Sequence, residues 1–130
     1  MRVIAVMSGK GGVGKSFVSV GLASALQRKT GASGILDGDI TGASVARLLG
    51  VSPGARVDRE GHLLPGVDSN GLKVASMSLM MPSEDKAVIW RGPLISRAIS
   101  QLYEDTAWGD IEYLVVDMPP GTSDAALTVL

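Results

Sequence analysis

Ser8-Gly9-Lys10-Gly11-Gly12-Val13-Gly14-Lys15-Ser16, near the start of this 130-residue chain, is the segment most indicative of its fold. From Gly9 onward it matches the pattern G-x-x-x-x-G-K-[ST]. Its glycines let successive backbone N–H groups turn toward one point, and the start of a helix adds positive potential there. We therefore predict a site for a nucleoside triphosphate, most simply ATP, with Lys15 on the outer phosphates and Ser16 on a Mg²⁺ ion. A glycine-rich turn that only caps a helix is the alternative.

The segments on either side have the periodicity of a strand and a helix. Val3–Met7 is a short apolar run typical of a strand buried on both faces, and apolar residues at helical spacing follow from Lys15 to Arg28, with Gly31 as a stop signal. Farther along, the sequence predicts strands at Gly34–Asp37, Leu72–Met77 and Tyr113–Asp117, and helices at Ser44–Leu49, Pro93–Tyr103 and Ser123–Leu130. Strands that alternate with helices indicate a doubly wound, parallel α/β sheet flanked by helices, here one domain over residues 1–130.

One connection has the composition of a surface loop. Val51–Gly71 is rich in glycine, proline and charge, and its apolar residues flank Arg59–His62, so a surface hairpin is expected there. His62 is the only histidine, and in such a loop a solvated side chain is favoured over a catalytic one.

Composition excludes several classes of function. The 12 Lys and Arg residues balance the 13 Asp and Glu residues, so the chain has no strong field that favours nucleic acid or an anionic membrane. The absence of cysteine excludes disulfides, thiolate catalysis and iron–sulfur ligation by these residues. With neither a membrane-spanning run nor a signal-peptide pattern, a cytoplasmic location is expected.

Carboxylates follow two of the predicted strands. Asp37 and Asp39 come at the end of the second strand, and Asp117 ends the last one. In a parallel sheet these ends share the edge where ligands bind, so we expect the acids to converge on the glycine-rich loop. Asp117 is predicted to hold Mg²⁺ directly or through water, and Asp39 to orient the attacking water or a metal-bound water. Capping of the following helix is the alternative for Asp37 and Asp39.

The sequence allows two interpretations for each of two further segments, Met118–Asp124 and Trp90-Arg91. Met118–Asp124 joins stiff prolines to a glycine, which fits a switch that senses the γ-phosphate and also fits a plain turn with Thr122 or Ser123 as a helix cap. Arg91, just before a predicted helix, is placed to meet an anion or a partner, whereas Trp90 beside it would simply pack.

Lys10, an extra lysine within the glycine-rich loop, resembles the signature lysine of the deviant Walker A family that includes MinD, ParA and the nitrogenase iron protein. Three further segments resemble the Mrp branch, the ATP-dependent iron–sulfur cluster carriers: Trp90–Pro93, Trp108-Gly109 and Asp117–Asp124. The likeness covers the whole chain and implies the P-loop NTPase fold.

The resemblance also implies roles for individual residues. Gly9 to Phe17 would contact the nucleotide, Lys15 its phosphates, and Lys10 the nucleotide of a partner subunit, which implies a homodimer. Ser16 and Asp117 would serve Mg²⁺, and Asp39 the attacking water. The implied activity is slow ATP hydrolysis that drives cluster transfer to recipient apoproteins.

Four departures from the family pattern qualify these roles. Phe17 replaces the usual threonine, so the hydroxyl that could bind the α-phosphate is missing. Gly38 stands where the family has an alanine, and Ala43 where it has a proline. The family's Cys-x-x-Cys pair, which holds the cluster, would lie beyond Leu130. Because the last apolar helical pattern ends without a cap, we expect a fragment. The resemblance implies that later strands of the family's sheet are missing, so the first strand is expected to be an exposed sheet edge. The alternatives are a MinD- or ParA-like switch and a fragment that keeps the motif without activity.

Overall fold

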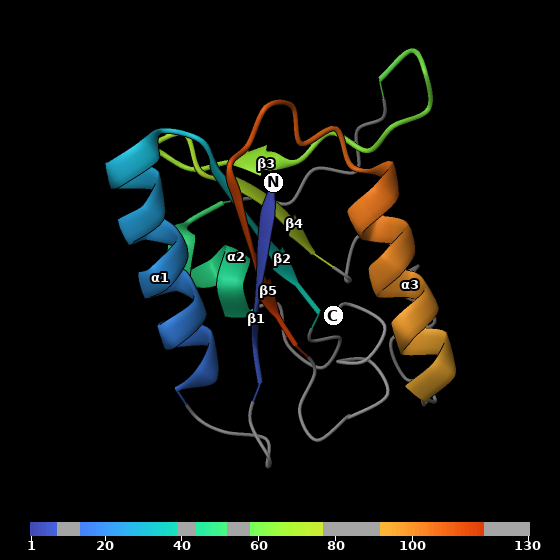
Figure 1. The fold of residues 1–130 in the computed structure, drawn as a ribbon, viewed down its shortest axis with the longest axis horizontal. Helices are drawn as coiled ribbons and strands as arrows, with labels where there is room; N and C mark the ends of the chain where they lie inside the picture. Colours follow the sequence, from blue (N-terminus) through green and yellow to red (C-terminus); the bar gives the residue numbers. More distant parts are fainter. Residues whose placement is uncertain (8–13, 39–43, 52–57, 77–91, 119–130) are drawn as a thin grey trace.

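The computed structural model describes residues 1–7, 14–38, 44–51, 58–76 and 92–118 (Figure 1). Its helices and strands are, in chain order, β1 (Arg2–Val6), α1 (Lys15–Thr30), β2 (Ser33–Asp37), α2 (Ser44–Leu49), β3 (Gly66–Val67), β4 (Lys73–Ser76), α3 (Gly92–Asp105) and β5 (Tyr113–Asp117). The alternation of strands and helices predicted from the sequence is confirmed for these elements. The helix predicted at Ser123–Leu130 lies outside the described residues.

The strands form one sheet in the order β1-β5-β2-β4-β3. β1, β5, β2 and β4 run parallel, and the short β3 pairs antiparallel with β4. Among the described strands, β1 lies at the edge beside β5, as the sequence led us to expect. The parallel order requires crossovers, and α1, α2 and α3 lie on them.

Helices cover both faces of the sheet, which makes the fold doubly wound. α1 and α2 lie on one face and α3 on the other (Figure 1). Alternate residues of β5 divide between two apolar clusters: Val115 packs with Ala23 of α1, whereas Leu114 and Val116 pack with Leu102 of α3. This alternation explains why β5 reads as a continuous apolar run.

The ends of α1 follow its glycines. Gly14, at the N-cap, has φ of 117°, a conformation that L side chains rarely adopt. Gly31 ends the helix in the left-handed conformation and donates its N–H to the Gln27 carbonyl oxygen. Within the described part of the chain, no helix has both the length and the apolarity needed to cross a membrane.

The surface hairpin predicted around Arg59–His62 is described only in part, because residues 52–57 lie outside the described residues. Asp58 and His62 close a tight turn through a backbone hydrogen bond of 2.9 Å, but Leu63 then forms a bridge with Thr106. Among the described strands, β3 and β4 pair antiparallel, and the turn between them is closed by the Gly71 N–H, which donates to the Asp68 carbonyl oxygen. The turn at residues 58–62 agrees with the predicted loop, and the pairing of the predicted hairpin stays a prediction.

Gly34 provides a test of how closely β2 packs. A Cβ at this position would lie 2.9 Å from two ring carbons of Trp108, and that ring is buried and tethered by its Nε1–H bond to the Tyr103 carbonyl. We expect Gly34→Ala to lower the free energy of unfolding by about 1–3 kcal/mol, measured by urea denaturation. Gly21→Ala, in open space on α1, is the matched control and should raise it by about 0.5–1 kcal/mol. Equal effects at the two positions would contradict this packing.

Candidate nucleotide site

The register of the sheet brings the ends of four strands into one row. Asp117, the last residue of β5, is paired with Val6 of β1 and with Asp37 of β2, and Asp37 is paired with Ser76 of β4. Two carboxylates are thus on adjacent strands, about 5 Å apart at the backbone. They lie at the carboxyl edge of the parallel sheet, where α/β folds bind their ligands.

Lys15 contacts Asp117 at this edge. The Nζ atom of Lys15 lies 2.6 Å from Oδ1 of Asp117 and also donates to the Met118 carbonyl oxygen. The two side chains are only 6% and 0% exposed. The pair therefore joins the first turn of α1 to the end of β5 in an environment that screens charge weakly.

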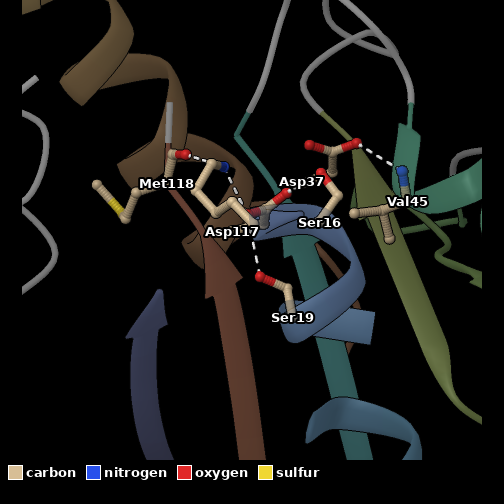
Figure 2. A network of polar contacts seen from close by, with 7 residues as sticks. Ser16, Ser19, Asp37, Val45, Asp117 and Met118 are labelled. Atoms are coloured by element: carbon tan, nitrogen blue, oxygen red, sulfur yellow. Dashed lines mark hydrogen bonds and ion pairs between the residues drawn. The ribbon is translucent and has the colours of Figure 1, made fainter. Parts of the chain in front are cut away.

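Two hydroxyls of α1 complete the contacts described for Asp117 (Figure 2). Ser16 Oγ donates to Oδ2 at 3.0 Å, and Ser19 Oγ donates to Oδ1 at 3.0 Å. Ser16 and Ser19 are one turn apart and so face the same side of the helix. Ser19 was not singled out from the sequence, although its spacing from Ser16 is the signal that could have identified it.

Asp37 lies beside this network and approaches α2. It is fully buried, and its Oδ2 accepts a hydrogen bond of 3.4 Å from the backbone N–H of Val45 (Figure 2). Val45 is in the first turn of α2, so this contact is the helix capping that the sequence had left open for Asp37.

The described residues carry only part of the predicted site. Lys15, Ser16 and Asp117 come together, and Phe17 is 65% exposed beside them. Residues 8–13, with Lys10, lie outside the described residues, as do Asp39, Arg91 and residues 119–124. The roles assigned to all these residues in nucleotide binding and hydrolysis remain predictions.

The start of α1 suits an anion. Gly14 provides no side-chain cap to this helix, and its first turn contains no acidic residue. The backbone N–H groups of that turn and the helix dipole are therefore not neutralised by the helix's own side chains. For a cation, Ser16 Oγ and Asp117 Oδ2 are hard oxygen ligands of the kind that Mg²⁺ prefers, so the residues present fit this ion.

Asp58, Glu60 and His62 form a separate group near Met1, at the amino end of β1 and away from the carboxyl ends of the strands. Their ligand atoms lie within 4.8 Å of one another. Asp58 accepts the backbone N–H groups of His62 and Glu60, and the first of these bonds is the main reason that the pKa of this carboxyl lies below its ordinary value of 3.8. The His62 side chain is 45% exposed, which favours the solvated interpretation of this histidine.

The buried ion pair can be tested by a double-mutant cycle. Lys15→Met leaves the Asp117 charge with two hydroxyl donors and no cation, and should lower the free energy of unfolding by about 3 kcal/mol. Adding Asp117→Asn removes that charge, so the double variant should lose less than the sum of the single losses. Urea denaturation followed by circular dichroism measures all four proteins. Lys29→Met, on the exposed side of α1, should change stability by under about 0.5 kcal/mol, and additive effects in the cycle would contradict the pairing.

Comparison with known proteins identifies the family. The family model for ParA, described as NUBPL iron-transfer P-loop NTPase, matches residues 1–130. The chain is 47% identical to an iron-sulfur cluster carrier protein of Clostridium perfringens, over 99% of this chain and 48% of that protein. It is also 48% identical to an iron-sulfur cluster carrier protein of Pyrococcus horikoshii, over 98% of this chain and 46% of that protein. The chain thus spans about half the length of these curated relatives.

Solved structures agree with this assignment. A nucleotide-binding protein of Archaeoglobus fulgidus, in complex with ADP, superposes with a TM-score of 0.74 at 39% identity, over 98% of this chain and 48% of that one. The MinC:MinD cell division complex of Aquifex aeolicus matches with a TM-score of 0.59 at 19% identity, over 100% of this chain and 52% of that one, which is a likeness of fold alone. A glycine-rich sequence between β1 and α1, carboxylates at the strand ends and a family model that matches residues 1–130 lead to one conclusion: the chain belongs to the ParA family of iron-transfer P-loop NTPases.

Proposed function

We propose that this chain binds ATP with Mg²⁺ at residues 9–17 and serves as the nucleotide-binding part of an iron–sulfur cluster carrier. The observation that carries the proposal is the meeting of Lys15, Ser16 and Asp117 at the start of α1, where Gly14 provides no side-chain cap. A cation, a hydroxyl and a carboxylate at a helix N-terminus are the parts that a P-loop protein uses to hold phosphates and their metal. The ADP bound to the Archaeoglobus fulgidus relative supports the same ligand class.

Ligand binding would involve an exchange of partners at Lys15. In the structure its ammonium group donates to Asp117 and Met118, so phosphate oxygens would compete with these acceptors for it. The phosphates replace a carboxylate with a more highly charged anion, which favours the exchange. When bound, Mg²⁺ would neutralise charge on the phosphate oxygens, with Ser16 and Asp117 as its protein partners.

Hydrolysis would depend on residues placed around that core. Asp39 would orient the attacking water, and Lys10 would reach the nucleotide of a second subunit, where it would stabilise charge as an arginine finger does. The activity is therefore proposed to belong to a homodimer and to be slow. Phe17, without a hydroxyl for the α-phosphate, would weaken nucleotide binding.

The transported cluster would bind outside these residues. The chain contains no cysteine, so it offers no thiolate for iron. Nucleotide binding and hydrolysis would then control a cluster site in the rest of a longer protein and its transfer to apoproteins in the cytoplasm. Relatives with 47% and 48% identity carry the carrier name, and this favours cluster transfer over a MinD- or ParA-like positioning switch.

Calorimetric titration with Mg²⁺ and a non-hydrolysable ATP analogue tests the binding site. The parent should bind saturably, and Lys15→Ala should weaken binding by roughly 10- to 100-fold because a charged contact to phosphate is lost. Lys29→Ala, at an exposed position in the last turn of α1, is the control and should bind as the parent does. Absence of binding by the folded parent would refute the proposed site.

Lys10→Ala tests the role of the second subunit. ATP turnover should fall by roughly 10³-fold, as it does when an arginine finger is removed, because the charge supplied in trans is lost. Nucleotide binding by a single subunit should persist, since Lys15 and Ser16 are unchanged. Steady-state phosphate release and calorimetry measure the two quantities separately. Turnover by Lys10→Ala at the parental rate would refute the action of Lys10 in trans.

A further inference from the structure

Ser19 is a buried polar residue that the nucleotide motif does not account for. It is 0% exposed, in the second turn of α1, and its hydroxyl donates to Asp117 Oδ1 at 3.0 Å (Figure 2). Serine inside a helix is less favourable than alanine, and a buried hydroxyl is costly unless it is hydrogen-bonded. The bond to Asp117 offsets both costs, so the position has an identifiable purpose in the site.

The two oxygens of Asp117 have different partners. Oδ1 accepts from Lys15 at 2.6 Å and from Ser19 at 3.0 Å, whereas Oδ2 accepts from Ser16 at 3.0 Å. Ser16 and Lys15 both belong to the nucleotide motif, and both would turn toward the ligand when it binds. Of these three donors, only Ser19 has no proposed contact with the nucleotide or its metal.

Ser19 can therefore hold Asp117 during the exchange. Once Lys15 leaves for a phosphate, the Ser19 hydroxyl still fixes Oδ1 and so limits rotation of the carboxylate about its side-chain torsions. Oδ2 is then kept on the side of Ser16, where the hard oxygen ligands meet. A carboxylate held in this way loses less rotational freedom when it binds an ion than one that turns freely.

We propose that Ser19 is a positioning residue, which orients Asp117 for Mg²⁺ and so sets the Mg²⁺ requirement of nucleotide binding. This inference rests on the proposed nucleotide site. It predicts that loss of the hydroxyl changes the response to Mg²⁺ and leaves the contacts between Lys15 and the phosphates intact.

The test is calorimetric titration of the non-hydrolysable ATP analogue at a series of Mg²⁺ concentrations and in excess chelator. Ser19→Ala should need about tenfold more Mg²⁺ for half-maximal enhancement of binding, as expected for one hydrogen bond to a charged group. Its affinity in chelator should equal that of the parent. Ser24→Ala, later in the same helix, is the matched control and should behave as the parent at every Mg²⁺ concentration.

A second variant separates the loss of the hydrogen bond from the loss of side-chain volume in Ser19→Ala. Ser19→Cys, kept reduced, is similar in size to serine but is a weak donor, and should shift the Mg²⁺ requirement in the same direction. Circular dichroism shows whether each variant is folded, and Ser19→Cys decides the question if Ser19→Ala does not fold.

Three results would overturn the inference, and they differ from failure of the nucleotide site itself. An unchanged Mg²⁺ requirement in both variants would show that Ser19 does not position Asp117. Equal loss of affinity with Mg²⁺ and in chelator would indicate a purely structural role. Failure of the parent to bind the analogue at any Mg²⁺ concentration would overturn the proposed function, and the role of Ser19 with it.

Discussion

The buried ion pair between Lys15 and Asp117 is the constraint on which the site depends. Taking two charges out of water is costly, and their attraction offsets that cost only when the remaining lone pairs and protons also find partners. The two hydroxyls at Asp117 and the Met118 carbonyl at Lys15 provide such partners. As a result, the first turn of α1 is fixed against the end of β5.

The sheet makes this pair possible by bringing together segments far apart in the chain. Lys15 and Asp117 are 102 positions apart, and β5 enters the sheet between β1 and β2. The strand that precedes the glycine-rich loop therefore lies beside the strand that ends in the carboxylate. Packing on both faces of β5 holds this arrangement, because its alternate side chains enter separate apolar clusters.

Because of the same ion pair, protein oxygens and the proposed ligand compete for Lys15. Lys15 donates to protein oxygens in the structure, so the phosphate oxygens of the proposed ligand would compete with them for the ammonium group. Asp117 would exchange an ammonium ion for a metal ion in the same process. A site of this kind couples nucleotide and metal binding through a shared carboxylate, and the orientation of that carboxylate becomes as important as its charge.

The alternation of strands and helices, the nucleotide motif and the carboxylates at strand ends could all be predicted from the amino-acid sequence. These features depend on residues close together in the sequence. Apolar runs such as Tyr113–Val116 indicate buried strands, and Gly14 and Gly31 indicate the ends of α1. The folded chain was needed to show that Ser19 donates to Asp117, that Asp37 caps α2, and that Leu63 pairs with Thr106. These contacts join residues from different elements, and their partners depend on strand order and register, which local periodicity does not encode.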